Sequence, residues 1–276
     1  MKVIQAKSAG FCYGVQRAVE LAEQTARERG GCVMLGSIIH NAHVVQHLEQ
    51  LGAHQVAGPE EIRPGDTVLI RAHGEKKQVI GHLKDIGAEC VDATCPNVLR
   101  VQQIVAQADA EGRVPIIIGD PNHPEVMGVA SWSARSVVFE EAEALQRWLD
   151  EDPARRELPL TAVAQTTCIR IIWDGAAEIL KKQCTNAKIF DTICNATHKR
   201  QSEAAELASQ VDVMVVVGDR KSANTKHLTE ICSRQCPAVY QIERAEELKR
   251  DFLTGCSVAG LTAGASTPAG IIKEVY

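Results

Sequence analysis

Three segments of the chain carry apolar residues at steps of three and four positions, which places them on one face of a helix. These segments are VQRAVELAEQTARERG at 15–30, NVLRVQQIVAQADAEG at 97–112 and ATHKRQSEAAELASQ at 196–210. Each is followed by a short apolar run rich in β-branched residues, without alternation, at 32–35, 114–118 and 211–217. Such runs are typical of strands buried on both faces of a parallel sheet. The pattern therefore predicts a helix and then a buried strand, three times.

A further helix and a second strand follow each of these strands. The second helix is clearest in HVVQHLEQLG at 43–52, and the second strands are DTVLIRAHG at 66–74, LPLTAVAQTT at 158–167 and CSVAGLTAGAS at 256–266. Because alternating strands and helices are joined by right-handed crossovers, we expect an α/β fold with a small, mainly parallel sheet in each unit. The predicted units are residues 12–94, 95–192 and 193–276, with residues 1–11 completing the third.

The same interval recurs at the start of each unit. A cysteine stands 24 positions before a glycine that closes the first strand, and a polar residue follows four positions after the glycine; the sets are Cys12, Gly36 and His40, then Cys95, Gly119 and His123, then Cys194, Gly218 and Ser222. A repeated interval with a repeated local pattern indicates an internal repeat. We therefore expect three units related by a pseudo-threefold axis.

The distinctive polar motifs follow the predicted strands. We call them the strand-end motifs; they are GSIIHN, RAHGE, GDPNHPE, AQTT, GDRKSAN and TAGAS. Ligands of open α/β sheets bind beyond the carboxyl ends of the strands. We expect these ends to face one central cavity, together with the three cysteines. Each cysteine stands at the start of a helix, where the helix dipole favours a thiolate.

Composition and charge narrow the class of protein. The 276 residues are 45% hydrophobic and 24% charged, as in a soluble globular protein. A net charge of -5 without a basic run argues against a nucleic-acid-binding protein. The N-terminal segment lacks an apolar core and the longest apolar runs have the length of strands, so we expect no signal peptide, no membrane span and a cytoplasmic location.

Ten cysteines in a reducing compartment are not expected to form disulfides, and no pair has the C-x-x-C spacing. Thiolates from three similar units could hold zinc, although a structural zinc site normally has a fourth protein ligand. A [4Fe–4S] cluster with three cysteine ligands would instead leave one iron open to substrate. The other cysteines are expected to be small buried residues; they are Cys32, Cys90, Cys168, Cys184, Cys232, Cys236 and Cys256.

Most polar residues in the strand-end motifs are hydrogen-bonding groups without a fixed charge. They are His40, Asn41, His73, Thr166, Ser222, Asn224 and Ser266. Such a set, helped by helix N-termini, suits a compact anion. Glu125 and His123 stand two positions apart in NHPE and could face one pocket as proton donors.

The motifs GFCYGVQRAV, IIHN, AHG, DATCP, HPEV, QTT, SAN and TAGAS, in this order, resemble the 4-hydroxy-3-methylbut-2-enyl diphosphate reductase family (IspH/LytB). The resemblance covers essentially the whole chain. It implies three α/β units around a [4Fe–4S] cluster. It also implies reductive dehydroxylation of an allylic alcohol diphosphate to isopentenyl and dimethylallyl diphosphate, the last step of the non-mevalonate isoprenoid pathway.

The resemblance also assigns roles by motif. Cys12, Cys95 and Cys194 would hold the cluster. The diphosphate and the rest of the substrate would be bound by His40, His73, His123, Thr166, Ser222, Asn224 and Ser266. Glu125 would protonate the leaving hydroxyl with Thr166 beside it, and His123 or the substrate's own diphosphate would protonate carbon. A small ferredoxin or flavodoxin would supply electrons.

Two departures from the family pattern stand out. Ala223, between Ser222 and Asn224, stands where family members often have a second serine. The missing hydroxyl would remove one contact to phosphate, at a cost of about 1 kcal/mol. The chain stops at Tyr276, within the predicted last helix, where relatives commonly continue. We expect this to affect closure of the last unit before it affects activity.

Two other functions fit part of the pattern. One is another enzyme with a three-cysteine cluster, such as a dehydratase or a quinolinate-synthase-like enzyme. The other is a non-catalytic module in which the thiolates hold zinc or a regulatory cluster. The combination of NHPE with AQTT favours the reductase, because a dehydratase would not need this set of diphosphate-binding and proton-relay residues.

Overall fold

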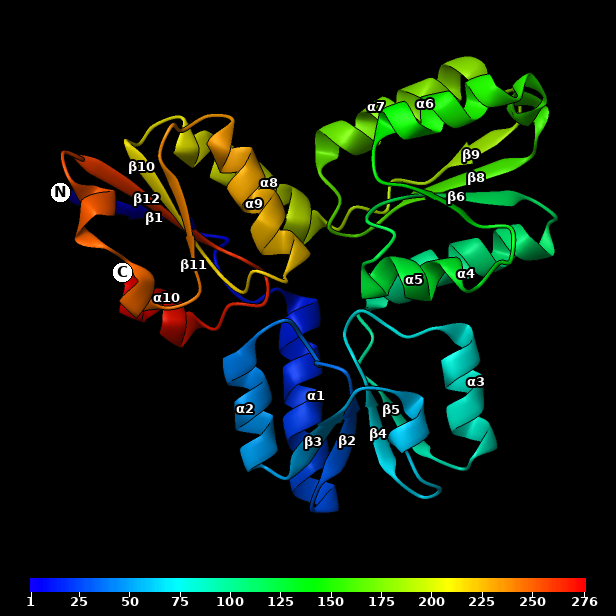
Figure 1. Ribbon diagram of the computed structural model, residues 1–276, viewed down its shortest axis with the longest axis horizontal. Helices are drawn as coiled ribbons and strands as arrows, with labels where there is room; N and C mark the ends of the chain where they lie inside the picture. The colour runs from blue at the N-terminus through cyan, green and yellow to red at the C-terminus, as the bar shows by residue number, and fades with distance from the viewer. The chain divides into compact units, whose positions relative to one another are not determined.

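In the computed structural model, which describes residues 1–276, the chain forms three four-stranded sheets in which every strand pair is parallel. Helices connect and cover the strands of each sheet (Figure 1). The predicted α/β class, with three small parallel sheets, is confirmed.

The first sheet along the chain has the strand order β3 (Ala53–Val56), β2 (Cys32–Leu35), β4 (Thr67–Ile70) and β5 (Glu89–Asp92). Its helices are α1 (Tyr13–Arg29), α2 (Ala42–Gln50) and α3 (Lys77–Asp85), with a short 3-10 turn at Pro59–Glu61. Val33, Val68 and Ile70 pack with Leu83 of α3 in one apolar core.

The second sheet has the order β7 (Val137–Phe139), β6 (Val114–Ile118), β8 (Leu160–Ala164) and β9 (Ala187–Ile189). In Figure 1, one face of this sheet is covered by α6 (Ala142–Glu151) and α7 (Arg170–Gln183), the other by α4 (Pro96–Ala110) and α5 (Pro124–Ala130). Ile116 and Ile118 pack into the core on the first face, whereas Ile117 packs into the core on the second. Burial on both faces explains the lack of alternation in such runs.

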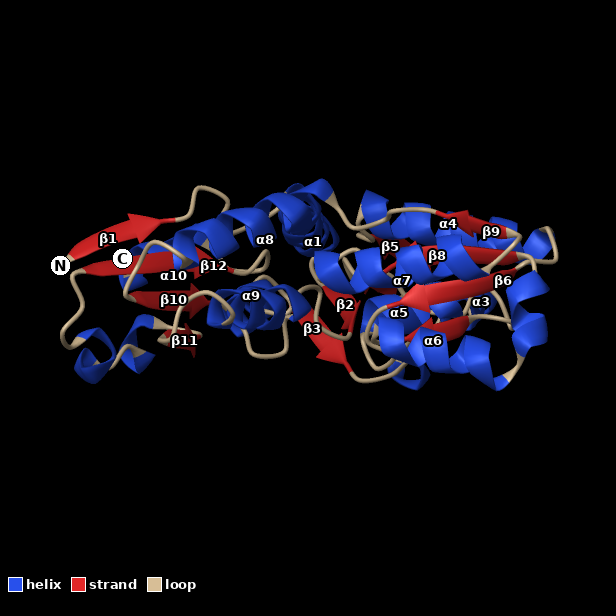
Figure 2. Ribbon diagram, turned by 90° about the horizontal axis from the view of Figure 1, so that it is seen from above, coloured by secondary structure: helices blue, strands red, loops and turns tan.

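The third sheet has the order β1 (Lys2–Gln5), β12 (Val258–Ala263), β10 (Val213–Val217) and β11 (Val239–Ile242), which lie side by side in Figure 2. Its helices are α8 (Asn195–Ala208), α9 (Ala223–Ser233) and α10 (Ala269–Val275), with 3-10 turns at Ala245–Glu247 and Arg250–Leu253. A further 3-10 turn, Pro153–Glu157, belongs to the second sheet and lies between α6 and β8. The N-terminal strand thus pairs with the last strand of the chain.

The packing of the chain divides it into two compact units. One comprises Met1–Val19, Ile39–His47 and Asn195–Tyr276, and it holds the third sheet; the other comprises Glu20–Ile38 and Leu48–Cys194, and it holds the first two. The boundaries predicted for three repeated units stay a prediction.

The pattern of the sequence did not reveal the edge strands β3, β5, β7, β9 and β11. These strands have only three or four residues and are partly exposed, so they show neither a continuous apolar run nor a long alternation. The central strands were predicted because they are buried at every position, as in β10, or at every position but the first, as in β6.

Two of the three recurring glycines have a steric cause. At Gly119 a Cβ atom would lie 2.7 Å from Cβ of Gln165 at the end of the neighbouring strand. Gly218 has φ +148°, and a Cβ there would lie 2.5 Å from Oγ1 of Thr225. At both positions, where the chain leaves its central strand, the neighbouring side chains leave room only for glycine.

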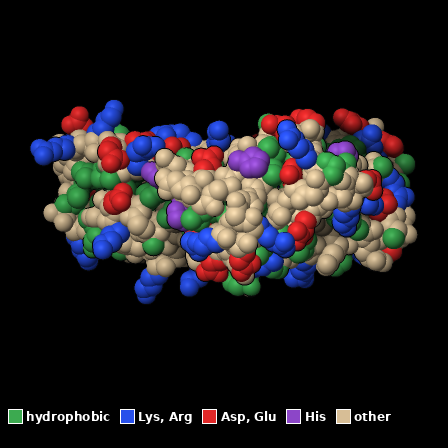
Figure 3. Space-filling view, turned by 90° about the horizontal axis from the view of Figure 1, so that it is seen from below, with side chains coloured by type: hydrophobic (Ala, Val, Ile, Leu, Met, Phe, Trp, Pro, Cys, Tyr) green, Lys and Arg blue, Asp and Glu red, His purple; other side chains and the backbone are tan.

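No helix is both long enough and apolar enough to cross a membrane. On the face shown in Figure 3, Lys and Arg side chains are interspersed with Asp and Glu side chains. This face has no large region of a single charge.

Candidate functional site

Glu125, the one acid among the predicted site residues, has a buried carboxyl group. It lies in the first turn of α5, is 2% exposed, and accepts two hydrogen bonds from Thr166. The Thr166 amide donates to Oε1 at 2.6 Å and its hydroxyl donates to Oε2 at 2.9 Å. Thr166 follows β8 and Glu125 follows β6, and these strands are parallel neighbours. Their adjacent carboxyl ends therefore bring the two residues together.

Burial changes the acidity of this group. It raises the pKa of Glu125 to about 7, although the hydrogen bonds from Thr166 act in the opposite direction. A carboxyl group with a pKa near neutrality can both hold and release a proton under ordinary conditions.

We expect the charge of Glu125 to make stability depend on pH. Because burial raises the pKa of Glu125 in the folded state, the folded chain binds this proton more tightly than the unfolded chain does. Proton binding therefore stabilises the fold fully at a pH below the unfolded pKa. This stabilisation is lost as the pH rises through 7. From about pH 4 to pH 8, wild type should lose roughly 3 kcal/mol of unfolding free energy relative to Glu125→Gln. Denaturant titrations of the metal-free chains at several pH values measure this difference. Parallel pH curves for the two proteins would contradict it.

His123 caps the helix that carries Glu125. Its Nδ1 accepts a hydrogen bond from the Glu125 amide at 3.1 Å, so the neutral ring carries its proton on Nε2. The ring of His73, in the loop after β4, meets it edge-on, with centroids 5.4 Å apart at 77°. Two predicted site histidines from different sheets therefore lie side by side.

Gln165 holds the loop that leads to His123, and it was not among the residues predicted for the site. The side chain is 2% exposed, and its Oε1 accepts a hydrogen bond from the Asp120 amide at 3.1 Å. Its backbone amide donates to the Ile118 carbonyl and extends the pairing of β6 with β8. Its place in AQTT, directly before Thr166, was the one available signal.

A second group of predicted residues lies around the N-terminus of α9. Ser222 caps this helix, with its hydroxyl accepting from the Thr225 amide at 3.5 Å. The hydroxyl of Ser266, which follows β12, donates to the Ser222 hydroxyl at 3.4 Å. Asn224 is half-buried in the first turn of the same helix. Clustered hydroxyl groups at a helix N-terminus suit an anion.

The residues before α2 have different environments. His40 is half-buried in the loop after β2. Asn41 is buried, and its Oδ1 accepts a hydrogen bond from the Val44 amide at 3.2 Å. The side-chain oxygen of Asn41 therefore caps α2.

The three repeated cysteines share a local geometry. Cys95 is the N-cap residue of α4, while Cys12 and Cys194 directly precede α1 and α8, and all three are half-buried. Their amides donate to carbonyl oxygens in three strand-end motifs: Cys12 to Ala265 of TAGAS, Cys95 to Ala72 of AHG, and Cys194 to Thr166 of QTT, at 3.3, 2.9 and 3.1 Å. The sequence repeat thus corresponds to a repeated backbone contact between each cysteine and a motif that carries a predicted site residue.

The remaining cysteines lack this setting. Burial raises the pKa of Cys168 and of Cys232 to about 12, which keeps these thiols protonated. Four of the seven are buried as expected, namely Cys32, Cys168, Cys232 and Cys236. The expectation was wrong for Cys90, Cys184 and Cys256, which are half-buried. None of the ten cysteines forms a disulfide.

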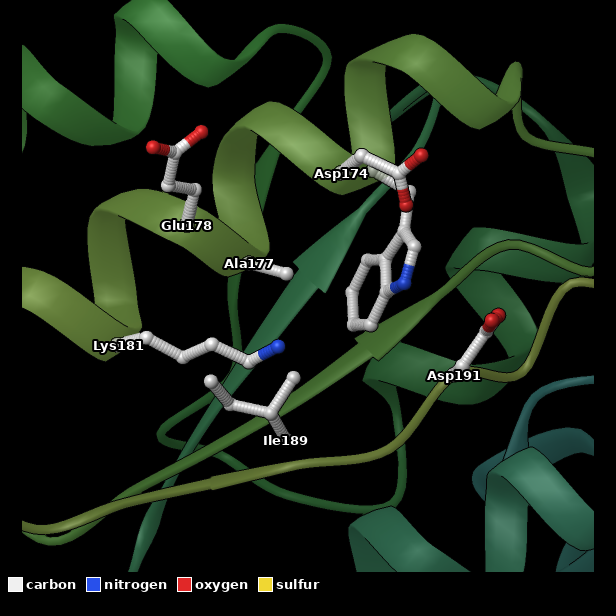
Figure 4. A pocket seen from close by; sticks show the side chains of 7 residues that line it. Asp174, Ala177, Glu178, Lys181, Ile189 and Asp191 are labelled. Atoms are coloured by element: carbon white, nitrogen blue, oxygen red, sulfur yellow. The ribbon is translucent and has the colours of Figure 1, made fainter.

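A separate surface pocket of about 450 Å³ lies between α7 and β9 (Figure 4). Its lining consists of Trp173, Asp174, Ala177, Glu178, Lys181, Ile189 and Asp191. None of these belongs to a strand-end motif, so this pocket is not part of the predicted site.

These features define a parallel α/β protein with thiols at three helix starts and a buried, hydrogen-bonded acid. The chain belongs to the LytB protein family, whose sequence model matches residues 3–276. Curated relatives are named 4-hydroxy-3-methylbut-2-enyl diphosphate reductase. That of Caldanaerobacter subterraneus subsp. tengcongensis is 40% identical over 283 residues, covering 100% of this chain and 95% of the relative. That of a Nitratiruptor species is 38% identical, covering 100% of this chain and 97% of the relative.

Solved structures are similar as well. One is of (E)-4-hydroxy-3-methyl-but-2-enyl diphosphate reductase, described as the terminal enzyme of the non-mevalonate pathway. It is 38% identical with a TM-score of 0.70, and the match covers 100% of this chain and 98% of the solved chain. The E-1-hydroxy-2-methyl-but-2-enyl-4-diphosphate reductase from Plasmodium falciparum is 26% identical with a TM-score of 0.92. The match covers 99% of this chain and 86% of the Plasmodium chain.

Proposed function

We propose that this chain is a 4-hydroxy-3-methylbut-2-enyl diphosphate reductase. It removes the hydroxyl group of the allylic substrate as water, with two electrons and two protons, to give isopentenyl or dimethylallyl diphosphate. Family membership over residues 3–276 and the names of its relatives support this activity. The single observation that carries it is the buried carboxyl of Glu125, held by Thr166 at a pKa of about 7.

The donor set fits a [4Fe–4S] cluster. Cys12, Cys95 and Cys194 are half-buried thiols at helix starts, each bonded through its amide to a strand-end motif. Three such thiols leave one iron without a protein ligand. Held by these three thiols, the cluster would supply electrons one at a time and a Lewis-acidic iron.

Glu125 acts as the general acid. Hydroxide is a poor leaving group, so the hydroxyl oxygen must receive a proton as the C–O bond breaks. With a pKa of about 7, Glu125 carries this proton in a large fraction of molecules at neutral pH. The two hydrogen bonds from Thr166 fix the orientation of the carboxyl group. The second proton goes to carbon, from His123 or from the substrate's own diphosphate.

The diphosphate is bound by neutral hydrogen-bonding groups. Ser222, Asn224 and Ser266 present hydroxyl and amide groups at the N-terminus of α9, where the helix dipole also favours an anion. His40, His73 and His123 contribute ring nitrogens to the same role. Electrons come from a small ferredoxin or flavodoxin in the cytoplasm.

We expect Ser222→Ala to raise KM more than it lowers kcat. The substitution removes one hydrogen bond to the diphosphate, worth about 1 kcal/mol, which corresponds to a roughly fivefold higher KM. Steady-state kinetics with Ser222→Thr as a rescue variant and Ser233→Ala as a control measure this, because Ser233 is exposed in the last turn of the same helix. An unchanged KM in Ser222→Ala would place the diphosphate elsewhere.

An anaerobic assay with the hydroxymethylbutenyl diphosphate and a reduced viologen dye tests the function directly. The reductase oxidises two equivalents of the one-electron dye for each product molecule formed. A dehydratase would release water without oxidising the dye, and a non-catalytic module would leave the substrate unchanged. Either result would refute the proposal.

A further inference from the structure

The segment between β1 and Cys12 is held by a buried arginine of α8. Arg200 is 3% exposed, and its guanidinium spans two carbonyl groups of this segment. Nε donates to the Ser8 carbonyl at 3.0 Å, and Nη2 donates to the Gly10 carbonyl at 2.7 Å. The rigid fork of donors of an arginine suits such a two-point contact, which a lysine cannot reproduce.

Glu203, one helical turn further along α8, holds the amide groups of the same segment. Oε1 accepts from the Lys7 amide at 2.6 Å, and Oε2 accepts from the Ser8 amide at 2.8 Å and from the Ser8 hydroxyl. Burial raises the pKa of Glu203, but these hydrogen bonds outweigh it, so the pKa lies below its ordinary value. The carboxylate is therefore charged at neutral pH, and both of its oxygens hold the segment.

The opposite side of the segment is also fixed. Gly10 has φ +101°, and a Cβ there would lie 3.0 Å from Cδ1 of Ile272 and 3.4 Å from the Thr267 carbonyl oxygen. The Cys12 amide donates to the Ala265 carbonyl at 3.3 Å. The approach to Cys12 is therefore confined between α8 and the loop after β12.

We propose that Arg200 and Glu203 are positioning residues for Cys12, forming a clamp on residues 7–10 that ties Cys12 to the helix starting directly after Cys194. The inference rests on the proposed function in one respect, namely that Cys12 and Cys194 are ligands of the same cluster. The helix α8 is continuous over 14 residues and starts directly after Cys194. A contact from its second turn therefore fixes the segment before Cys12 relative to the helix that follows Cys194. Loss of the clamp should therefore release the Cys12 ligand before the other two.

The test compares Arg200→Gln, Arg200→Lys and Glu203→Gln with two matched controls in the full chain. Arg113→Gln removes another buried arginine that donates to backbone carbonyls, those of Leu160 and Asn186, in the second sheet. Glu206→Gln makes the same chemical change as Glu203→Gln at an exposed carboxylate three residues further along α8.

The first measurement needs no cluster. In the metal-free chains, hydrogen exchange at Lys7 and Ser8, and the rate of alkylation of Cys12 relative to Cys95, are followed by peptide mass spectrometry. Arg200→Gln and Glu203→Gln should raise both by roughly tenfold, the effect of losing hydrogen bonds to a charged group. The exchange and alkylation rates of Arg200→Lys should lie between those of wild type and Arg200→Gln. Both controls should leave the ratio of the Cys12 to the Cys95 alkylation rate unchanged.

The second measurement uses the anaerobically purified, iron-loaded chains. Loss of an outer residue that orients a ligand weakens metal binding by about 10- to 100-fold, so the clamp variants should lose iron to a chelator faster than Arg113→Gln does. The electron paramagnetic resonance spectrum of the iron that remains should also differ from that of wild type.

The outcomes separate the clamp from the proposed function. If wild type holds no cluster, the proposed function fails, and exchange and alkylation still decide whether the clamp positions Cys12. If wild type holds a cluster and the clamp variants match the controls in both measurements, the clamp is wrong. Should Arg200→Gln fail to fold, Arg200→Lys and Glu203→Gln decide the question by the same comparison.

Discussion

Glu125→Gln is expected to lower kcat by roughly 10²- to 10⁴-fold, the usual contribution of a general acid. Glutamine has the shape of the protonated acid and can still accept a hydrogen bond from the Thr166 amide. It cannot release a proton to the leaving hydroxyl. Because the proposed diphosphate contacts are unchanged, KM should stay within about twofold of wild type.

Single-turnover and steady-state assays with a reduced viologen dye measure this effect. Glu178→Gln is the control, since Glu178 is an exposed carboxylate on α7 that pairs with Lys182. Glu125→Asp keeps an acid but shortens its reach towards Thr166, so its kcat should fall between those of wild type and Glu125→Gln. Near-normal turnover by Glu125→Gln would mean that another group protonates the hydroxyl.

Serine at any one of positions 12, 95 and 194 is expected to abolish the cluster and the turnover together. Anaerobically purified wild type should be brown and contain about four irons per chain, as a cuboidal cluster requires. Each serine variant should contain well below one iron per chain, because an alcohol is a far weaker ligand for iron than a thiolate is. Iron and sulfide analysis together with the visible spectrum measure the loss.

The matched control for this experiment is Cys256→Ser. Cys256 is also half-buried, but its thiol donates to the nearby Thr254 carbonyl at 3.9 Å and lies in no strand-end motif. This variant should keep its iron and its activity. Stoichiometric zinc without sulfide in wild type would end the cluster assignment, and retention of four irons by a serine variant would remove that cysteine from the ligand set.

The central strands and main helices follow from the sequence because their patterns are local. The runs at 32–35 and 114–118 coincide with β2 and β6, and the helix predicted at 97–112 is α4 with its ends shifted by one or two residues. Edge strands such as β9 were missed, since three partly exposed residues carry too little pattern.

The residues proposed for the candidate site also came from the sequence, and their roles stay predictions. Their environment could not be predicted from the sequence. The repeat pointed to three cysteines and the motif NHPE pointed to Glu125. The raised pKa of Glu125 comes from burial, which outweighs its contact with Thr166, 41 positions away. Gln165 was overlooked because a glutamine that positions a loop looks like any other polar residue in a sequence.

The sequence by itself determined the α/β class, the three parallel sheets, the three cysteines of the repeat and the family resemblance, because periodicity and spacing are properties of the chain. Only the tertiary structure revealed that each cysteine amide meets a strand-end motif and that Arg200 reaches Gly10 across 190 positions. Acidity and positioning depend on burial and on partners distant in the sequence, and these exist only once the chain has folded.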